Sequence, residues 1–242
     1  FRRVLFRSIY FDRFAVSEWA ARGTFEPLDR FLANDKTIRA EDFYKSCWDE
    51  VVYQGKVYGI PNKVDDRALF YNVDLLKRAG FDAPPKTWEE LETMALKLTE
   101  RDERSKAIKR LGFVPNYGNS WLYIYGWMNG GEFMSADGKT CTLNDPAIVD
   151  ALAWMTKVYD ALGGVQEVSA FQSTFQGGDL DPFLQGKIAM KISGFWELTD
   201  TYAQYGRDVN WAVAPPPMPA AQAAKGRTTL SWNGGWCYAI PS

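Results

Sequence analysis

The sequence predicts an α/β fold, because helical and strand patterns alternate along its 242 residues and no internal repeat interrupts them. Apolar residues make up 46% of the chain, which is enough to bury at least one full core. The length allows one large domain or two ordinary ones. No run approaches the ~20 apolar residues that a membrane span needs, so no spanning helix is expected.

Short elements are expected in the first sixty residues. Residues 9–11 have the pattern of a strand end, and residues 16–22 that of a short helix that Gly23 closes. The runs 51–53 and 57–60 predict a hairpin around Gln54 and Gly55.

Clearer signals follow. Residues 68–71 form a short apolar run that predicts a buried strand, after which Asn72 caps a helix that Gly80 ends. Residues 87–90, Thr-Trp-Glu-Glu, form a capping box at the start of the next helix. Apolar residues then recur at helical spacing: Trp88, Leu91, Met94, Ala95 and Leu98.

A second strong helix begins at Asp145 and Pro146 and stops at the Gly163-Gly164 pair. Its expected inward residues are Ile148, Val149, Leu152, Met155, Tyr159 and Leu162. The alternation in 187–193 predicts a half-buried strand. A helix over 196–204 and strands over 209–213 and 232–240 complete the pattern.

Composition excludes several functions. The chain contains no histidine, so a Ser-His-Asp triad, a Cys-His pair and an HExxH zinc site are all ruled out. A formal net charge of -2 gives no basic field for nucleic acid. The cysteines at 47, 141 and 237 show no metal or disulfide spacing and are expected to be free. We therefore expect no metal, no cofactor and no nucleic-acid partner.

Both ends of the sequence are unusual. Residues 1–8 are basic and apolar but lack the small-residue cleavage site of a signal peptide, and the chain stops directly after an aromatic, Gly-rich strand pattern. We expect an internal fragment of a longer protein.

Six segments together resemble a known family. They are residues 9–14, 53–61, 69–76, 85–91, 183–190 and 194–196. In their order and spacing the chain is similar to the extracellular solute-binding proteins of ABC transporters, in the carbohydrate-binding family that includes maltose-binding protein. The resemblance implies a two-lobed periplasmic-binding-protein fold, type II-like and truncated at both ends. It places a partial first lobe at 1–66, a crossing strand at 67–71, the second lobe at 72–230 and a returning strand at 231–242.

The resemblance also assigns polar ligand contacts. Asp12 and Arg13, which follow a strand end, match a pair that binds sugar hydroxyls. A family carboxylate falls on Asp65 or Asp66, and neighbouring residues on a strand point to opposite faces. We favour Asp65 as the ligand contact, and we expect Asp66 or Arg67 to be a hinge residue or a solvent-exposed one.

Aromatic rings cover the apolar faces of sugars, and candidates lie at the joints between elements. Trp196 matches the family's stacking tryptophan. Tyr117 or Trp121, at the start of a helix, is expected to provide a second ring, whereas Tyr123 and Trp127 suit the helix's buried face. In the segment 231–236 two glycines allow a close backbone approach, and there we select Trp232 and Asn233 as ligand contacts and Trp236 as core.

The implied function is reversible capture of a sugar or oligosaccharide between two closing lobes, without catalysis. A monomer that docks on membrane permease subunits is expected, in a periplasm or outside the cell, with lipid attachment as an option. Three alternatives stay open: a glycosidase that uses carboxylates among Asp12, Asp65, Asp66 and Glu197, a lectin-like adhesion module, and a binder of glycerophosphodiesters or polyols through Arg13 or Arg67.

Overall fold

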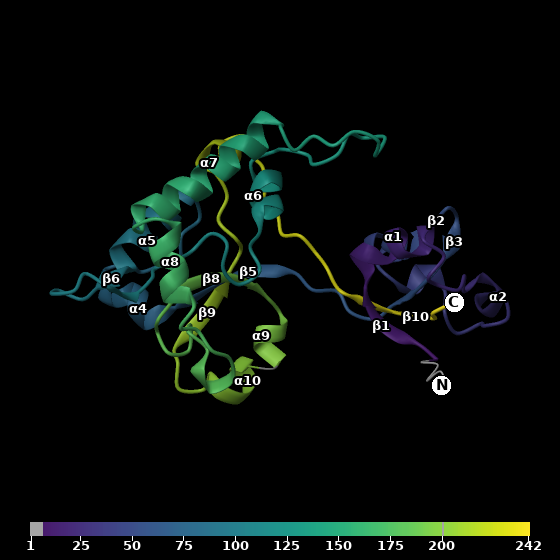
Figure 1. The fold of residues 1–242 in the computed structure, drawn as a ribbon, viewed down its shortest axis with the longest axis horizontal. Helices are drawn as coiled ribbons and strands as arrows, with labels where there is room; N and C mark the ends of the chain where they lie inside the picture. The colour runs from purple at the N-terminus through teal and green to yellow at the C-terminus, as the bar shows by residue number, and fades with distance from the viewer. Residues whose placement is uncertain (1–6, 200) are drawn as a thin grey trace. The chain divides into compact units, whose positions relative to one another are not determined.

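A computed structural model describes residues 7–199 and 201–242, which form two compact units (Figure 1). Unit 1 contains the described residues up to Asp66 together with Asn233–Ser242, and unit 2 contains Arg67–Trp232. Most of the unusual stub at 1–8 lies outside the described residues. Each unit is described by itself below, and the lobe boundaries expected from the sequence stay a prediction.

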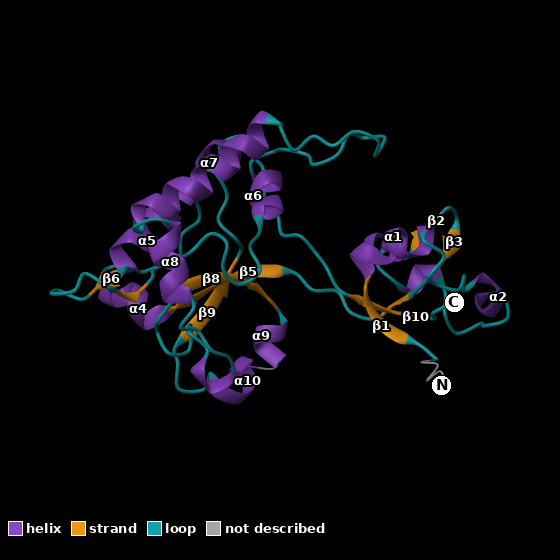
Figure 2. Cartoon of the chain, viewed as in Figure 1, coloured by secondary structure: helices purple, strands orange, loops and turns teal. Residues whose placement is uncertain are grey.

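Unit 1 is built on a three-stranded antiparallel sheet in the order β1-β10-β4 (Figure 2). Its strands are β1 (Ile9–Asp12), β10 (Trp236–Ala239) and β4 (Ile60–Pro61), with the hairpin β2 (Val52–Tyr53) and β3 (Lys56–Val57) beside it. The helices are α1 (Val16–Ala21), α2 (Asp29–Leu32) and α3 (Lys45–Glu50), and short 3-10 turns span Arg13–Ala15 and Ala40–Asp42. Val16, Val51 and Cys237 form its small core.

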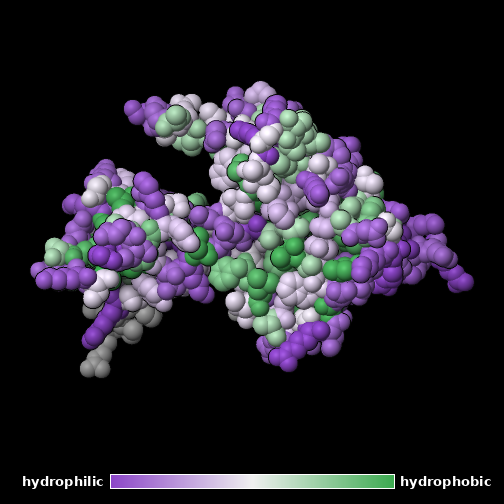
Figure 3. Space-filling view, turned by 180° about the vertical axis from the view of Figure 1, so that it is seen from behind, coloured by the Kyte–Doolittle hydropathy of each residue, from purple (hydrophilic) through white to green (hydrophobic). Residues whose placement is uncertain are grey.

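Unit 2 has the sheet β8-β5-β9, in which β5 (Arg67–Asn72) lies antiparallel to both β8 (Met190–Gly194) and β9 (Trp211–Ala214). The helices are α4 (Val73–Arg78), α5 (Trp88–Leu98), α6 (Leu122–Met128), α7 (Pro146–Ala161), α8 (Val165–Gln172), α9 (Trp196–Thr199), α10 (Thr201–Tyr205) and α11 (Ala220–Ala223). A 3-10 turn spans Gly178–Leu180, and β6 (Glu100–Arg101) pairs with β7 (Ile108–Arg110). The loop that joins these two strands projects as a hydrophilic extension (Figure 3).

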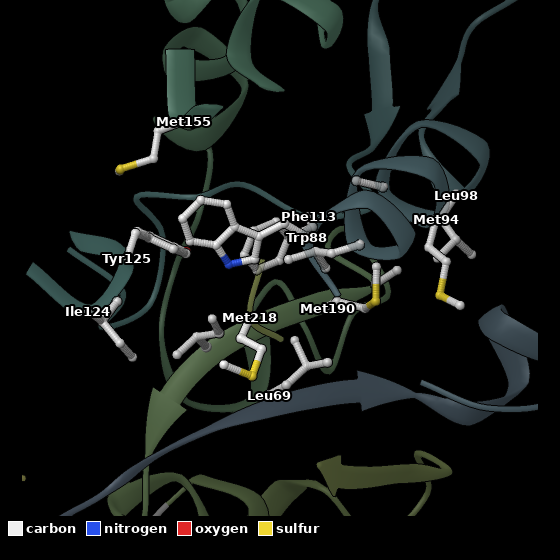
Figure 4. Packing of buried hydrophobic residues seen from close by; sticks show 14 of the residues in the cluster. Leu69, Trp88, Met94, Leu98, Phe113, Ile124, Tyr125, Met155, Met190 and Met218 are labelled. Carbon is white, nitrogen blue, oxygen red and sulfur yellow. The ribbon is translucent and has the colours of Figure 1, made fainter. Parts of the chain in front are cut away.

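Two apolar clusters cover the two faces of the β5 strand. Leu69 belongs to one cluster and Phe70 to the other, as the alternation of side chains along a strand requires. In the first cluster Trp88 stacks on Trp154 with ring centroids 4.3 Å apart, and its indole N–H donates to the Pro217 carbonyl at 3.0 Å. Figure 4 shows Trp88 surrounded by Tyr125, Met218 and Phe113.

The expected helix starts are present. Asn72 accepts a hydrogen bond from the Leu75 N–H at 2.9 Å, Thr87 from the Glu90 N–H at 3.2 Å, and Asp145 from the Ala147 N–H at 2.8 Å. The reciprocal bond of the predicted capping box shifts by one residue, because the Glu90 carboxylate accepts from the Lys86 N–H at 2.6 Å.

The burial predicted for β8 and for α7 was wrong. The strand expected to be half-buried, β8, is buried along its whole length, including Lys191 at 3% exposure, because both apolar clusters cover it. On α7, Val149 and Leu152 are 51% and 49% exposed. Ile148, Met155 and Val158 form that helix's buried stripe, and the other two lie off it.

The structure also bears on metals, thiols and membranes. Among the described residues no group of three or more acidic, Cys or His side chains is placed to hold a metal ion. All three cysteines are free, as expected: Cys47 and Cys237 are buried and Cys141 is exposed. In the part of the chain that is described, no helix combines the length and apolarity that crossing a bilayer requires.

Candidate ligand-binding site

In unit 2 a buried arginine lies between two tryptophans. The guanidinium carbon of Arg67 is 3.6 Å from the centroid of the Trp232 ring and 4.9 Å from that of Trp196. Its Nε donates to the Asn119 side-chain oxygen at 2.6 Å, and the Ser231 hydroxyl bonds both backbone groups of Arg67, at 2.7 and 2.8 Å. With Arg67 only 5% exposed, these cation–π and hydrogen-bonding contacts hold three distant chain segments together. Of the two residues expected at solvent or at a hinge, Asp66 is exposed and Arg67 is not, and the hinge stays a prediction.

A row of aromatic rings continues from Trp232. Its ring centroid lies 6.3 Å from Trp121 in a stacked arrangement and 5.3 Å from Tyr123 in an edge contact. Tyr123 also contacts Trp121 at 5.4 Å and Trp127 at 5.5 Å. Trp121 is 46% exposed, and Tyr123, Trp127 and Trp232 are half-buried. The core placement predicted for Tyr123 and Trp127 therefore fails, and in its place unit 2 carries a partly exposed aromatic row.

The indole N–H of Trp232 has a distinct environment. It is buried and finds no hydrogen-bond acceptor among the described residues. Buried indole N–H groups normally have such a partner. Because this nitrogen is buried, the row presents the face of the Trp232 ring to its neighbours and not the indole N–H to solvent.

Trp196 sits where β8 turns into α9, and buried charges fix that turn. The Glu197 carboxylate accepts from the Ser193 hydroxyl at 2.8 Å and pairs with the Lys191 ammonium at 2.9 Å. Lys191 also lies 3.4 Å from Asp181. A Cβ at position 194 would overlap the Trp196 ring, so the glycine there is what lets the ring lie against the backbone.

Tyr117 and Trp121, the alternatives for a second stacking ring, have different environments. The Tyr117 ring packs edge-on against Phe175 at 5.4 Å, within the second apolar cluster. Burial, followed by the negative charges of Asp181 and Glu197, raises the pKa of Tyr117, so its phenol stays neutral. Of the two, Trp121 is the ring that belongs to the exposed row.

In unit 1 the two residues expected to bind sugar hydroxyls, Asp12 and Arg13, differ in burial. Asp12 is half-buried and accepts from the Phe14 N–H at 3.2 Å. Arg13 has no exposed surface, because it pairs with Glu50 at 2.7 Å and donates to the carbonyls of Gly234, at 2.7 Å, and Lys63. The burial of Arg13 argues against the expected ligand contact and favours a role in holding two backbone segments together.

Asp65 and Asn233 lie on the two backbone segments that Arg13 joins. Asp65 and Gly234 form an antiparallel bridge with N–H to O distances of 3.1 and 2.9 Å, and Asp65 is 5% exposed. The Asn233 amide lies 3.5 Å from the Ser46 hydroxyl. A Cβ at Gly235, where φ is +139°, would overlap the Lys63 carbonyl oxygen, which is the close backbone approach that the glycine pair predicts.

Trp236 was expected in the core and is instead 39% exposed. It lies on the outer face of β10, where burial alternates, and stacks on Tyr10 with centroids 4.9 Å apart and planes 7° from parallel.

Comparison with known protein families identifies the family of this chain. The family model of the bacterial extracellular solute-binding proteins matches residues 8–242, and the chain belongs to that family. This agrees with the family expected from the six segments.

Individual relatives carry more specific names. The chain is 39% identical over 196 residues to a probable ABC transporter-binding protein of Deinococcus radiodurans, covering 77% of the chain and 43% of the relative. It is 30% identical over 197 residues to the maltodextrin-binding protein MdxE of Bacillus subtilis, again covering 77% and 43%. The solved structure of CpMnBP1 with mannobiose bound matches with a TM-score of 0.85 at 30% identity, covering 98% of the chain and 58% of that structure. The chain thus spans about half the length of these relatives.

Sequence reasoning missed the structural importance of Arg67 and Lys191. Both are charged residues within strands that lie under apolar clusters, and both bring a positive charge beside an aromatic ring. A charged residue inside an otherwise apolar strand pattern could have indicated this role, because a buried charge requires a partner.

Proposed function

We propose that the protein is the ligand-capturing component of an ABC importer and that its ligand is a neutral sugar or oligosaccharide. The observation that carries the proposal is the aromatic row of unit 2, in which Trp121 and Trp232 stack beside Arg67 and Trp196. Flat rings cover the apolar C–H face of a pyranose.

Polar groups of unit 1 suit the same ligand class. In unit 1, the half-buried Asp12 and Asn233 offer a carboxylate and an amide for hydroxyls, and Asp65, at 5% exposure, could offer only the small part of its carboxylate that is accessible. The names of the relatives, which refer to maltodextrin and mannobiose, point in the same direction.

The competing ligand classes find less support. Arg13 is committed to Glu50 and two carbonyls, and Arg67 is held between tryptophans, so neither arginine is arranged as an open phosphate clamp. Among the glycosidase candidates, Glu197 is committed to Lys191 and Ser193, an arrangement that suits a structural carboxylate better than a general acid. We infer that no bond is broken.

Calorimetric titration of the full-length protein tests the ligand class. The panel contains gluco- and manno-oligosaccharides, a polyol, a glycerophosphodiester and a short peptide. Saturable binding of a saccharide alone is expected. Binding of the phosphodiester or the peptide, without binding of any saccharide, overturns the proposal, and hydrolysis of the bound oligosaccharide during the titration replaces it with an enzyme.

We further infer a location outside the cytoplasmic membrane and a permease partner, because the family is extracellular and a probable ABC transporter-binding protein is among the relatives. The closure on ligand expected from the sequence stays a prediction. Small-angle scattering of the full-length protein tests it: a radius of gyration that ligand leaves unchanged contradicts closure and favours the lectin-like module.

A further inference from the structure

The guanidinium of Arg67 lies over two tryptophan rings of unit 2. Its central carbon is 3.6 Å from the Trp232 ring centroid and 4.9 Å from that of Trp196. The two tryptophans belong to different segments of the chain, one at the start of α9 and the other before Asn233. A single buried cation therefore brings both rings to one place.

Neither contact leaves room for a sugar between the arginine and a ring. Atoms in van der Waals contact lie about 3.5–4.0 Å apart, so a pyranose inserted between a guanidinium and an indole would need about twice that separation. The distances to Trp232 and to Trp196 are both shorter. Arg67 thus supports the rings from the side that a stacked ligand does not occupy.

The side chain of Arg67 is anchored to the strand that leads to Trp196. Its Nε donates to the Asn119 side-chain oxygen at 2.6 Å, and the Asn119 N–H donates to the Ile192 carbonyl at 2.8 Å. Gly118 forms a bridge with Ile192, and a Cβ on this glycine would overlap the Ile192 carbonyl oxygen. The guanidinium is therefore tied to β8 through a loop that fits closely on that strand.

The backbone of Arg67 is anchored to the segment that carries Trp232. The Ser231 hydroxyl accepts from the Arg67 N–H at 2.7 Å and donates to the Arg67 carbonyl at 2.8 Å. On the other side, Arg67 pairs across the sheet with Gly194, where a Cβ would overlap the Trp196 ring. Arg67 thus has a fixed contact with each segment that provides a ring.

An arginine meets these requirements and a lysine does not. A planar guanidinium can lie against a ring face while the N–H groups at its edge donate to other partners. An ammonium is a compact, strongly hydrated charge on a flexible stem, and it cannot fix the orientation of a ring in the same way. The combination of two ring contacts with the Asn119 bond therefore depends on the guanidinium itself.

We propose that Arg67 is a positioning residue of the binding site, which holds Trp196 and Trp232 in the arrangement that accepts the sugar and does not itself touch the ligand. Rings that are ordered before the ligand arrives lose less freedom on binding, so Arg67 contributes affinity through preorganisation. The inference rests on the proposed function, since it concerns how the same rings are presented.

Two measurements on the full-length protein test the inference. Calorimetric titration with maltotriose and with mannotriose gives the affinity, and near-ultraviolet circular dichroism of the unliganded protein reports the order of the tryptophan rings. Arg67→Lys keeps the charge but loses the planar group, and it should lower affinity about 5- to 30-fold and weaken the near-ultraviolet signal. In Trp232→Leu, which already lacks the nearer ring, the same change should cost under about 2-fold.

Two further variants complete the design. Asn119→Ala leaves Arg67 in place but removes the acceptor of its Nε, and it should lower affinity about 2- to 5-fold with the same change in the near-ultraviolet signal, which keeps the test decisive if Arg67→Lys is unstable. Arg101→Lys is the matched control, because Arg101 also bonds a backbone carbonyl, that of Leu162, but pairs with Glu167. It should change neither affinity nor signal.

The outcomes separate the positioning of the rings from the ligand class. Losses that multiply in the variant carrying both Arg67→Lys and Trp232→Leu overturn the inference, because Arg67 would then act independently of the nearer ring. An unchanged near-ultraviolet signal in Arg67→Lys, or unchanged affinity in Asn119→Ala, also overturns it. If the wild type binds no saccharide at all, the proposed function fails, and the near-ultraviolet signal alone decides whether Arg67 orders the rings.

Discussion

The two units hold their candidate ligand contacts by different physical means. In unit 1, a single buried arginine joins the segments that carry Asp65 and Asn233, chiefly through backbone carbonyls. In unit 2, Trp196 and Trp232 contact Arg67 through cation–π interactions, and Trp121 stacks on Trp232. Polar contacts depend steeply on direction, whereas ring faces tolerate changes of ligand. We infer that unit 1 selects among sugars and that unit 2 supplies affinity.

The largest effect should come from the arginine of unit 1. Arg13→Met leaves the Gly234 and Lys63 carbonyls without their donor and Glu50 without its partner. Loss of a buried ion pair costs about 3–5 kcal/mol, and we expect the lower end because Glu50 is 30% exposed. Hydrogen exchange on the whole chain should accelerate at 61–66 and 233–239 but not at β5 and β8.

The control for this prediction is Arg30→Met in the same unit. Arg30 pairs with Glu26 at 2.9 Å, but its side chain is 70% exposed, so little stability should be lost. If both variants exchange like the wild type, Arg13 does not hold unit 1 together, and the contrast between the units loses its basis.

The next effect concerns the buried carboxylate of unit 2. Glu197→Gln keeps a hydrogen-bond acceptor for Ser193 but leaves Lys191 with Asp181 alone, at 3.4 Å. We expect a loss of about 2–3 kcal/mol in the free energy of unfolding, measured with urea, because a buried charge is then poorly compensated. Ligand affinity should also fall, since Trp196 precedes Glu197 and depends on the same turn.

Glu167→Gln provides the comparison for Glu197. It breaks the pair with Arg101, in which Glu167 is 40% exposed, and should cost under about 1 kcal/mol without changing affinity. Equal effects of the two substitutions on affinity would show that Glu197 does not position Trp196.

A third prediction compares how a substitution in each unit changes ligand selectivity. Trp196→Leu should lower affinity about tenfold, roughly 1.4 kcal/mol, by a similar factor for two epimeric sugars, because a ring face does not read one hydroxyl. Asp65→Asn should instead change the ratio between the epimers, because a carboxylate that accepts from a hydroxyl is directional. Calorimetry of the full-length protein measures both constants.

Trp19→Leu serves as the control, since Trp19 is an exposed tryptophan of unit 1 at 37%. If Trp196→Leu changes the ratio between the epimers more than Asp65→Asn does, the division of labour between the units is reversed.

Local signals predicted the fold better than the site. The bonds at Asn72, Thr87 and Asp145 are made within one turn of chain, so the residue types alone specify those helix starts. Burial of β8 depends on two apolar clusters assembled from distant segments, and its alternating pattern misled the prediction. The interior position of Arg13 depends on Glu50 and Gly234, which lie 37 and 221 residues away, and no local pattern encodes that.

The smallest expected effect is the change in stability of unit 1 with pH, which is negligible near neutral pH and comes from a thiol in its core. Cys237 has no exposed surface, and burial raises the pKa of its thiol from 9.0 to about 12. The folded pKa lies above the unfolded one, so this contribution to stability is complete below about pH 9 and is lost as the pH rises toward 12. Unit 1 should therefore lose stability above about pH 9, and unit 2 above about pH 10, because burial raises the pKa of Tyr117 and Tyr125 above their usual value of 10.0.

Iodoacetamide labelling with mass spectrometry measures this difference. At pH 8 the exposed Cys141 should be alkylated readily, whereas Cys237 should react only when unit 1 opens. In Arg13→Met, which weakens unit 1 selectively, labelling of Cys237 should rise with no change at Cys141. Rapid alkylation of Cys237 in the wild type would mean that the core of unit 1 opens without losing Arg13, and the arginine would then not be what keeps that unit closed.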